Sequence, residues 1–154
     1  MTNNEVVRSL QHALAITPRR LASLFALGGQ RLSPEEAGRL TLRERDEEHV
    51  ACTNEQLVAL LDGFILDERG PGDSPPPPAP TRMTGNLVLK KLRVGLTLQE
   101  EDLLRLLRAG GETLDKHQLT SLFRKPGHKH YKKCSDEVLQ AFFRGLAAHE
   151  SAER

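Results

Sequence analysis

The side chains of this chain best suited to chemistry are crowded into residues 124–133, which read RKPGHKHYKK. This basic loop combines five cations with two histidines and a tyrosine, contains no acid, and is followed directly by Cys134. Such residue types fit four interpretations: a metal site, a Cys/His catalytic pair, a surface that contacts phosphates, or a solvated loop. The candidate binding residues are Arg124, Lys125, His128, Lys129, His130, Tyr131, Lys132 and Lys133.

The two cysteines do not have the spacing of a metal site. Zinc takes four ligands, usually as two close pairs, whereas Cys52 and Cys134 lie far apart and the histidines near them are irregularly spaced. Each cysteine directly precedes an expected helix cap, where it can pack on Leu57 or Leu139 as a small apolar residue. We therefore predict no metal and no cofactor.

Motifs of enzymes are also missing from the sequence. The chain has no phosphate-binding glycine loop with its lysine, no G-x-S-x-G and no H-E-x-x-H. Two acidic groups, Glu35-Glu36 and Glu100-Glu101-Asp102, fall in the first turns of expected helices, where carboxylates stabilise the helix dipole. We predict a non-enzymatic protein with no catalytic residue, and an unrecognised enzyme remains the remote alternative.

The loop belongs to the second copy of an internal repeat. When the chain is shifted by 82 positions, residues 1–70 lie on residues 83–152 without a gap, and 18 of the 70 pairs are identical, mostly at apolar and glycine positions. This pattern predicts two homologous domains, 1–70 and 83–154. Residues 71–82 between them include four consecutive prolines, which favour an extended linker; a proline-rich peptide ligand is the alternative.

Each copy has the pattern of four short helices. Apolar residues recur at helical spacing, and Thr17, Ser33 and Thr53 precede three of the helices of the first copy as caps. No alternating β pattern extends beyond a few residues, so we predict an all-α fold of two four-helix modules in tandem, packed with pseudo-twofold symmetry. Gly63 and Gly145 lie inside the last helix of each copy; they indicate either a close helix crossing or a tolerated glycine.

Composition and charge set the broad class. The 154 residues carry a net charge of +1, and the chain has neither a hydrophobic leader nor an apolar segment long enough to span a bilayer. We expect a cytoplasmic protein that does not enter the membrane. The copies differ, however: residues 1–70 have 8 cations and 11 anions, and residues 83–154 have 13 and 9. The segment equivalent to the basic loop, residues 42–51, reads LRERDEEHVA; we name it the acidic loop.

Several stretches together resemble the YehS-like family of small bacterial cytosolic proteins with two copies of a domain of unknown function. They are LKKLRVGL, LFRKPGHKHYKKCSDEVLQAFFRGL, the proline run and the start MT.N shared by both copies. The resemblance covers essentially the whole chain. It implies an all-helical duplicated fold and a bacterial source, and it brings no activity, substrate or catalytic residue.

Three interpretations of the basic loop stay open. Its cations could neutralise the phosphates of nucleic acid, with Tyr131 or a histidine stacking on an exposed base. The preceding helix, Gly110-Gly111 turn and helix also outline a helix-turn-helix, with residues on the second of these helices that can reach base edges. Those residues are His117, Gln118, Thr120 and Ser121. Alternatively, the loop meets an acidic protein surface, such as residues 44–48 of another molecule or of the other copy, in a scaffold or self-association. A solvated loop is the third interpretation.

Overall fold

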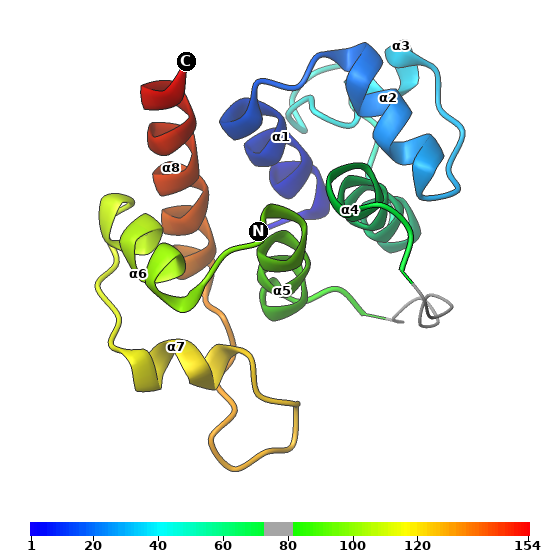
Figure 1. Cartoon of the computed structure of the whole chain (residues 1–154). Helices are drawn as coiled ribbons and strands as arrows, with labels where there is room; N and C mark the ends of the chain where they lie inside the picture. The colour runs from blue at the N-terminus through cyan, green and yellow to red at the C-terminus, as the bar shows by residue number, and fades with distance from the viewer. Residues whose placement is uncertain (73–81) are drawn as a thin grey trace. The chain divides into compact units, whose positions relative to one another are not determined.

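The fold is all-α, as predicted. The computed structural model describes residues 1–72 and 82–154, and within these ranges it has eight helices and no strand (Figure 1). The first four are α1 (Asn3–Leu14), α2 (Pro18–Leu27), α3 (Pro34–Arg39) and α4 (Asn54–Arg69). The second four are α5 (Gly85–Leu96), α6 (Glu100–Ala109), α7 (Lys116–Leu122) and α8 (Asp136–Glu153).

The chain divides into two compact units of four helices each. The first unit is Met1–Met83 and the second unit is Thr84–Arg154. The proline run predicted to be a linker falls on residues that lie outside those described. The pseudo-twofold packing of the two modules also stays a prediction.

The polar residues predicted to cap helices do so. The hydroxyls of Thr17, Ser33 and Thr53 accept hydrogen bonds from the backbone N–H groups three positions along, at 3.0 to 3.2 Å. Asp115 and Ser135 do the same in the second unit. These bonds satisfy N–H groups that have no partner inside the helix, so the local sequence determines where these five helices begin.

Leucine is the commonest buried residue in the core of each unit. Helix α2 packs on α4, and α6 packs on α8. The largest fully buried side chains include Phe25, Leu21 and Leu57 in the first unit and Phe142, Leu89 and Leu103 in the second. Leucines at helical spacing therefore contribute more residues to the core of each unit than any other type does.

The glycines inside the last helix of each unit mark a close helix crossing. A Cβ atom on Gly63 would lie 1.8 Å from the Leu24 carbonyl oxygen, and one on Gly145 would lie 1.9 Å from that of Leu106. Gly28 meets the backbone of Ala59 in the same way. The crossing leaves no room for a side chain, so the prediction of close approach is confirmed over a merely tolerated glycine.

None of the helices in the described ranges combines the length and apolar character that a bilayer crossing needs.

Candidate functional site

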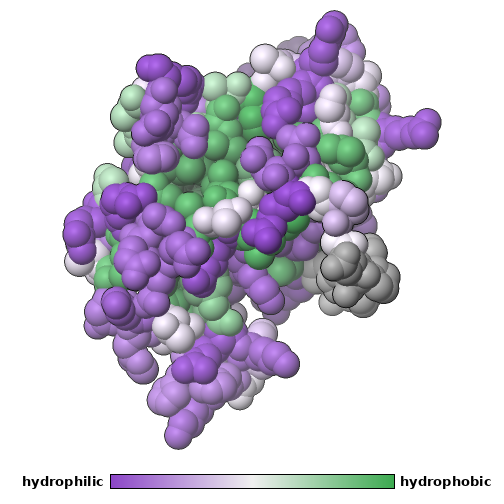
Figure 2. Space-filling model, viewed as in Figure 1, coloured by the Kyte–Doolittle hydropathy of each residue, from purple (hydrophilic) through white to green (hydrophobic). Residues whose placement is uncertain are grey.

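The basic loop connects α7 to α8 and extends beyond the second unit's helices (Figure 1). All five of its cations and both of its histidines are exposed, whereas Tyr131 is half-buried. Hydrophilic side chains cover this end of the unit in Figure 2. In the described part of the chain, no ion pair joins a loop cation to a carboxylate. The loop therefore presents uncompensated positive charge to solvent.

The backbone of the loop is folded into two consecutive turns. The N–H of His128 donates to the Lys125 carbonyl at 3.0 Å, and the N–H of Tyr131 donates to the His128 carbonyl at 2.9 Å. Gly127 has φ +96°, which a side chain would disfavour. Local hydrogen bonds thus give the exposed cations an ordered backbone.

The histidine rings of this region lie close together. The centroid of His130 is 5.6 Å from that of His128 and 5.9 Å from that of His117 on α7. The Nδ1 atom of His128 accepts a hydrogen bond from the His130 backbone N–H at 3.0 Å. His128 and His130 are therefore exposed rings on an ordered loop, as stacking on a base would require.

A buried asparagine ties the end of the loop to the core. The Nδ2 of Asn86 donates to the carbonyls of Leu122 at 3.0 Å and Lys132 at 2.9 Å, and its Oδ1 accepts from the Cys134 N–H at 2.8 Å. The Tyr131 hydroxyl also donates to this Oδ1, at 3.2 Å. One side chain on α5 therefore joins the end of α7 to the start of α8.

The first unit contains the same arrangement, which we call the asparagine clamp: a buried asparagine that bonds both ends of the connection before the last helix. The Nδ2 of Asn4 donates to the carbonyls of Leu40 and Val50, at 3.0 and 2.8 Å, and its Oδ1 accepts from the Cys52 N–H at 3.0 Å. Asn4 and Asn86 are identical in the two copies, but the sequence alone predicted no role for them. What could have indicated a role is that they are a polar pair among identical positions that are mostly apolar or glycine.

Two of the predicted binding residues line a hollow beside the loop. Lys132 and Lys133 border a space of about 320 Å³ between α7 and the start of α8. The other lining residues are Glu112, Thr113, Leu114, Gln118, Leu122, Ser135 and Val138. The exposed loop cations therefore lie next to a concave surface, and two of them form part of its lining.

Tyr131 has a different position from the one predicted. Its hydroxyl donates a hydrogen bond to Asn86 and its side chain is half-buried, so it packs against the core and anchors the loop. The other seven candidate residues are exposed. Stacking on a base would therefore fall to the histidines.

The helix-turn-helix interpretation loses one of its four candidate side chains, Ser121, whereas His117, Gln118 and Thr120 are exposed. Ser121 is 8% exposed and its hydroxyl donates to the His117 carbonyl at 2.9 Å. The Thr120 hydroxyl donates to the Lys116 carbonyl, and the Gln118 side chain accepts from the Asp115 N–H in a capping box. These groups are already bonded within α7, which is only seven residues long. The expectation that Ser121 reaches a base edge is wrong because the residue is buried.

Both cysteines pack as apolar residues, as their positions directly before the helix caps predict. Cys52 is 7% exposed and Cys134 is 3% exposed, and neither forms a disulfide. Burial raises the pKa of the Cys52 thiol to about 12; burial and, secondarily, the Asp136 charge raise that of Cys134 to about 11. Within residues 1–72 and 82–154, no group of three or more His, Cys, Asp or Glu side chains could hold a metal ion.

The fold and the clamp define a class of all-helical protein built from two copies of one four-helix unit. The chain belongs to the family described as "Protein of unknown function (DUF1456)", whose model matches residues 3–70 and 85–150, one match in each unit. It is also similar to the Uncharacterized protein YehS of Escherichia coli (strain K12), with 33% identity over 156 residues that cover all of this chain and 99% of that protein. No solved structure matches. The family resemblance and the duplication are both confirmed.

Proposed function

We propose that this is a non-enzymatic binding protein that contacts nucleic acid through the basic loop of its second unit. The observation that carries the proposal is a ten-residue loop with five exposed cations, no acid, and an ordered backbone tied to the core by Asn86. Cations held on a fixed loop lose less conformational freedom when they meet phosphates than cations on a flexible tail. The loop is thus organised for a polyanion.

The chemistry of the contact follows from the residue types. Lysine and arginine side chains neutralise backbone phosphates and release their counterions, so binding strengthens as salt is lowered. His128 and His130 provide exposed rings that a base can stack on. Lys132 and Lys133 lie at the edge of the 320 Å³ hollow, where part of an unpaired nucleotide would fit. This arrangement favours phosphate contact with little sequence preference.

The thiols support a binding protein rather than an enzyme in this proposal. A thiolate is the reactive form of cysteine, and burial keeps both thiols protonated far above neutral pH. A Cys/His nucleophile is therefore a poor interpretation of the loop and Cys134. The same pair of buried thiols without a disulfide fits a cytoplasmic protein, where thiols stay reduced.

Charge reversal at Lys129, Lys132 and Lys133 tests the proposal. We expect this triple Lys→Glu variant to lose retention of RNA or DNA in a gel-shift assay while its far-UV circular dichroism is unchanged. For the wild type, the log–log slope of affinity against salt should be about −3 for three or four B-DNA contacts.

A matched control separates the loop from net charge. Arg19, Arg31 and Arg108 are exposed cations outside the loop, and reversing them changes the net charge by the same amount. This control should keep most of the binding. Equal loss in both variants, or retention by the loop variant, would contradict the proposal.

A second candidate function is supported by the acidic loop. Glu44, Asp46, Glu47 and Glu48 are exposed, so another molecule offers the basic loop a surface of opposite charge. In that case, reversing the loop lysines should disrupt self-association measured by analytical ultracentrifugation. Reversing the four acids as well should restore it, because the partners have exchanged signs. Nucleic-acid binding allows no such rescue, since phosphates keep their charge.

A further inference from the structure

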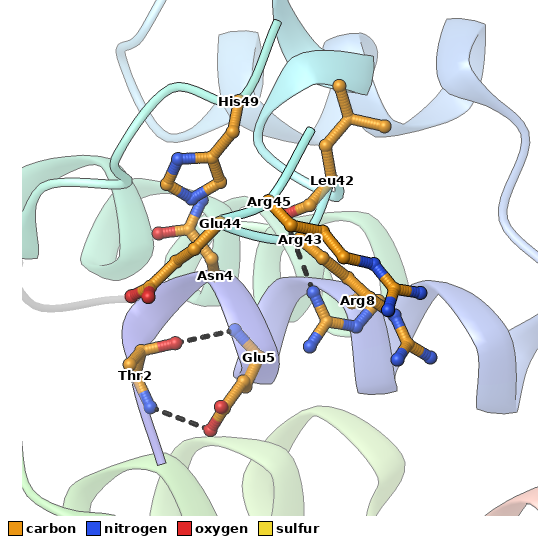
Figure 3. Close-up of a pocket in the computed structure, with 9 residues that line it drawn as sticks. All are labelled: Thr2, Asn4, Glu5, Arg8, Leu42, Arg43, Glu44, Arg45 and His49. Atoms are coloured by element: carbon orange, nitrogen blue, oxygen red, sulfur yellow. Dashed lines mark hydrogen bonds between the residues drawn. The ribbon is translucent and has the colours of Figure 1, made fainter. Parts of the chain in front are cut away.

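A second concave site lies in the first unit, where the start of α1 faces the acidic loop (Figure 3). Its volume is about 550 Å³, within the range of sites that hold small molecules. The lining residues are Thr2, Asn4, Glu5, Arg8, Leu42, Arg43, Glu44, Arg45 and His49. All of them belong to one unit, so the site is complete within it.

Three arginines form one side of this pocket. Arg8 comes from α1, and Arg43 and Arg45 come from the acidic loop; Figure 3 shows their guanidinium groups on the same side. Arg8 donates weakly to the Leu42 and Thr41 carbonyls at 3.4 and 3.5 Å, which holds it toward the loop. None of the three forms an ion pair with a carboxylate of the described residues. Grouped guanidinium donors match the geometry of a phosphate.

The opposite part of the pocket is bounded by His49, which has a buried polar atom without a partner. The Nε2 of His49 is buried and has no hydrogen bond within the described structure. At the equivalent position of the second unit, the Tyr131 hydroxyl bonds to the clamp asparagine, so its polar atom is satisfied. Buried polar groups rarely lack partners. Because this atom is closed to solvent, it faces the protein interior, and His49 bounds the pocket only with the rest of its side chain.

The acids of the pocket do not neutralise the arginines. Glu5 is engaged at the helix start, where its Oε2 accepts from the Thr2 N–H at 3.0 Å. Glu44 lies in Figure 3 on the side away from the guanidinium groups. Its carboxylate is an acceptor for hydroxyl or amino groups. The pocket thus has a cationic end and an end that accepts hydrogen bonds.

We propose that this pocket binds a small phosphorylated molecule with several hydroxyl groups, of the sugar phosphate or nucleotide class. The phosphate is held by Arg8, Arg43 and Arg45, and the hydroxyl-bearing part contacts the Glu44 carboxylate. This site is separate from the basic loop and does not depend on the proposed nucleic-acid contact.

Calorimetric titration of the full chain with ribose 5-phosphate, glucose 6-phosphate and adenosine monophosphate tests the proposal, with ribose and inorganic phosphate as partial ligands. At least one of the three esters should bind more tightly than either partial ligand. Arg43→Ala and Arg45→Ala should each weaken that ester by about tenfold, the loss of a charged hydrogen bond. Arg31→Ala, an exposed arginine outside the pocket, is the matched control and should change nothing.

A further variant tests the end of the pocket that accepts hydrogen bonds. Glu44→Ala removes the exposed carboxylate, and it should weaken the ester relative to inorganic phosphate. Thermal melting of each variant verifies that it is folded. The proposal is overturned if none of the esters binds, if phosphate alone binds as well as the ester, or if only oligonucleotides bind. Loss of ester binding in the charge-reversed basic loop variant would also overturn the assignment to the first unit.

Discussion

The loops of the two units show what the duplication kept and what it changed. In each, the N–H three residues after Arg43 or Lys125 donates back to that residue's carbonyl, at 2.9 and 3.0 Å, and a second turn follows at 3.1 and 2.9 Å. In each, a buried asparagine bonds the two ends of the connection. Yet one loop carries four acids and two arginines, and the other carries five cations and no acid.

This comparison distinguishes the residues that the fold requires from the surface residues that are free to change. The asparagine clamps satisfy backbone groups that would otherwise be buried without partners, so any working unit needs them. The exposed loop positions face water, where a change of charge costs little stability. Sharing the backbone while reversing the charge therefore allows two units of one fold to present different surfaces. The proposed sites follow that division: a basic surface in one unit and a small-molecule pocket in the other.

Substitution of the clamp asparagines should cause the largest loss of stability in both units. Asn86→Ala leaves two carbonyls, one N–H and the Tyr131 hydroxyl without their partner, and it should lower the free energy of unfolding by about 3 kcal/mol or more. Asn4→Ala removes three such bonds and should cost nearly as much. Urea denaturation followed by circular dichroism measures both.

The neighbouring asparagine is a suitable control for the clamp. Asn3 is only half-buried, and its side chain donates to Asn54 and Cys52 near the surface. Asn3→Ala should cost about 1 kcal/mol or less because water can replace these bonds. Hydrogen exchange in residues 124–133 should rise in Asn86→Ala and stay unchanged in Asn3→Ala. Similar losses from Asn3 and Asn4 would show that the clamp is not special.

The helix crossings should give the next largest effect, and they should be alike in the two units. Gly63→Ala and Gly145→Ala force a methyl group against a carbonyl oxygen, so each should lower stability by about 1–3 kcal/mol. Gly38→Ala in α3 meets no atom within 4 Å and should raise stability by up to about 1 kcal/mol. Thermal denaturation distinguishes these signs. A neutral result at Gly63 or Gly145 would mean that the helices move apart at little cost.

The fold could be predicted because its signals are local. Capping residues, apolar spacing and the paired glycines each depend on a few neighbouring positions or on the repeat itself, and the structure has the helices that they indicate. Exposure of the loop cations was also predictable, since five charges in ten residues cannot all be buried.

The site was less predictable because its bonds are long-range. Asn86 reaches carbonyls 36 and 46 residues away, and no local pattern shows which polar residue will turn inward. The same limit applies to Tyr131, whose hydroxyl partner is 45 residues away, and to Ser121, whose burial depends on how α7 packs. The pocket of the first unit joins α1 to a distant loop, with Arg8 bonded to Leu42, 34 residues away, and only the folded chain brings them together.

The two thiols can be compared through the pH dependence of stability. Unfolded thiols ionise near pH 9, whereas folded Cys134 and Cys52 ionise only near 11 and 12. The folded state therefore keeps protons that the unfolded chain loses, so this contribution to stability is complete below pH 9 and is lost as the pH rises further. Its slope is at most about 1.4 kcal/mol per pH unit for each thiol.

Single variants assign this slope to one unit or the other. Cys52→Ala retains only the Cys134 thiol, so its extra loss of stability should level off near pH 11, whereas in Cys134→Ala the loss should continue to about pH 12. Urea denaturation from pH 8 upward, with the double alanine variant subtracted to remove the lysine and tyrosine titrations, measures the difference. If the wild type and the double variant have the same pH dependence, then neither thiol has a raised pKa in the folded state. In that case neither thiol is desolvated in the folded protein, and the interpretation of the two cysteines as buried packing residues is wrong.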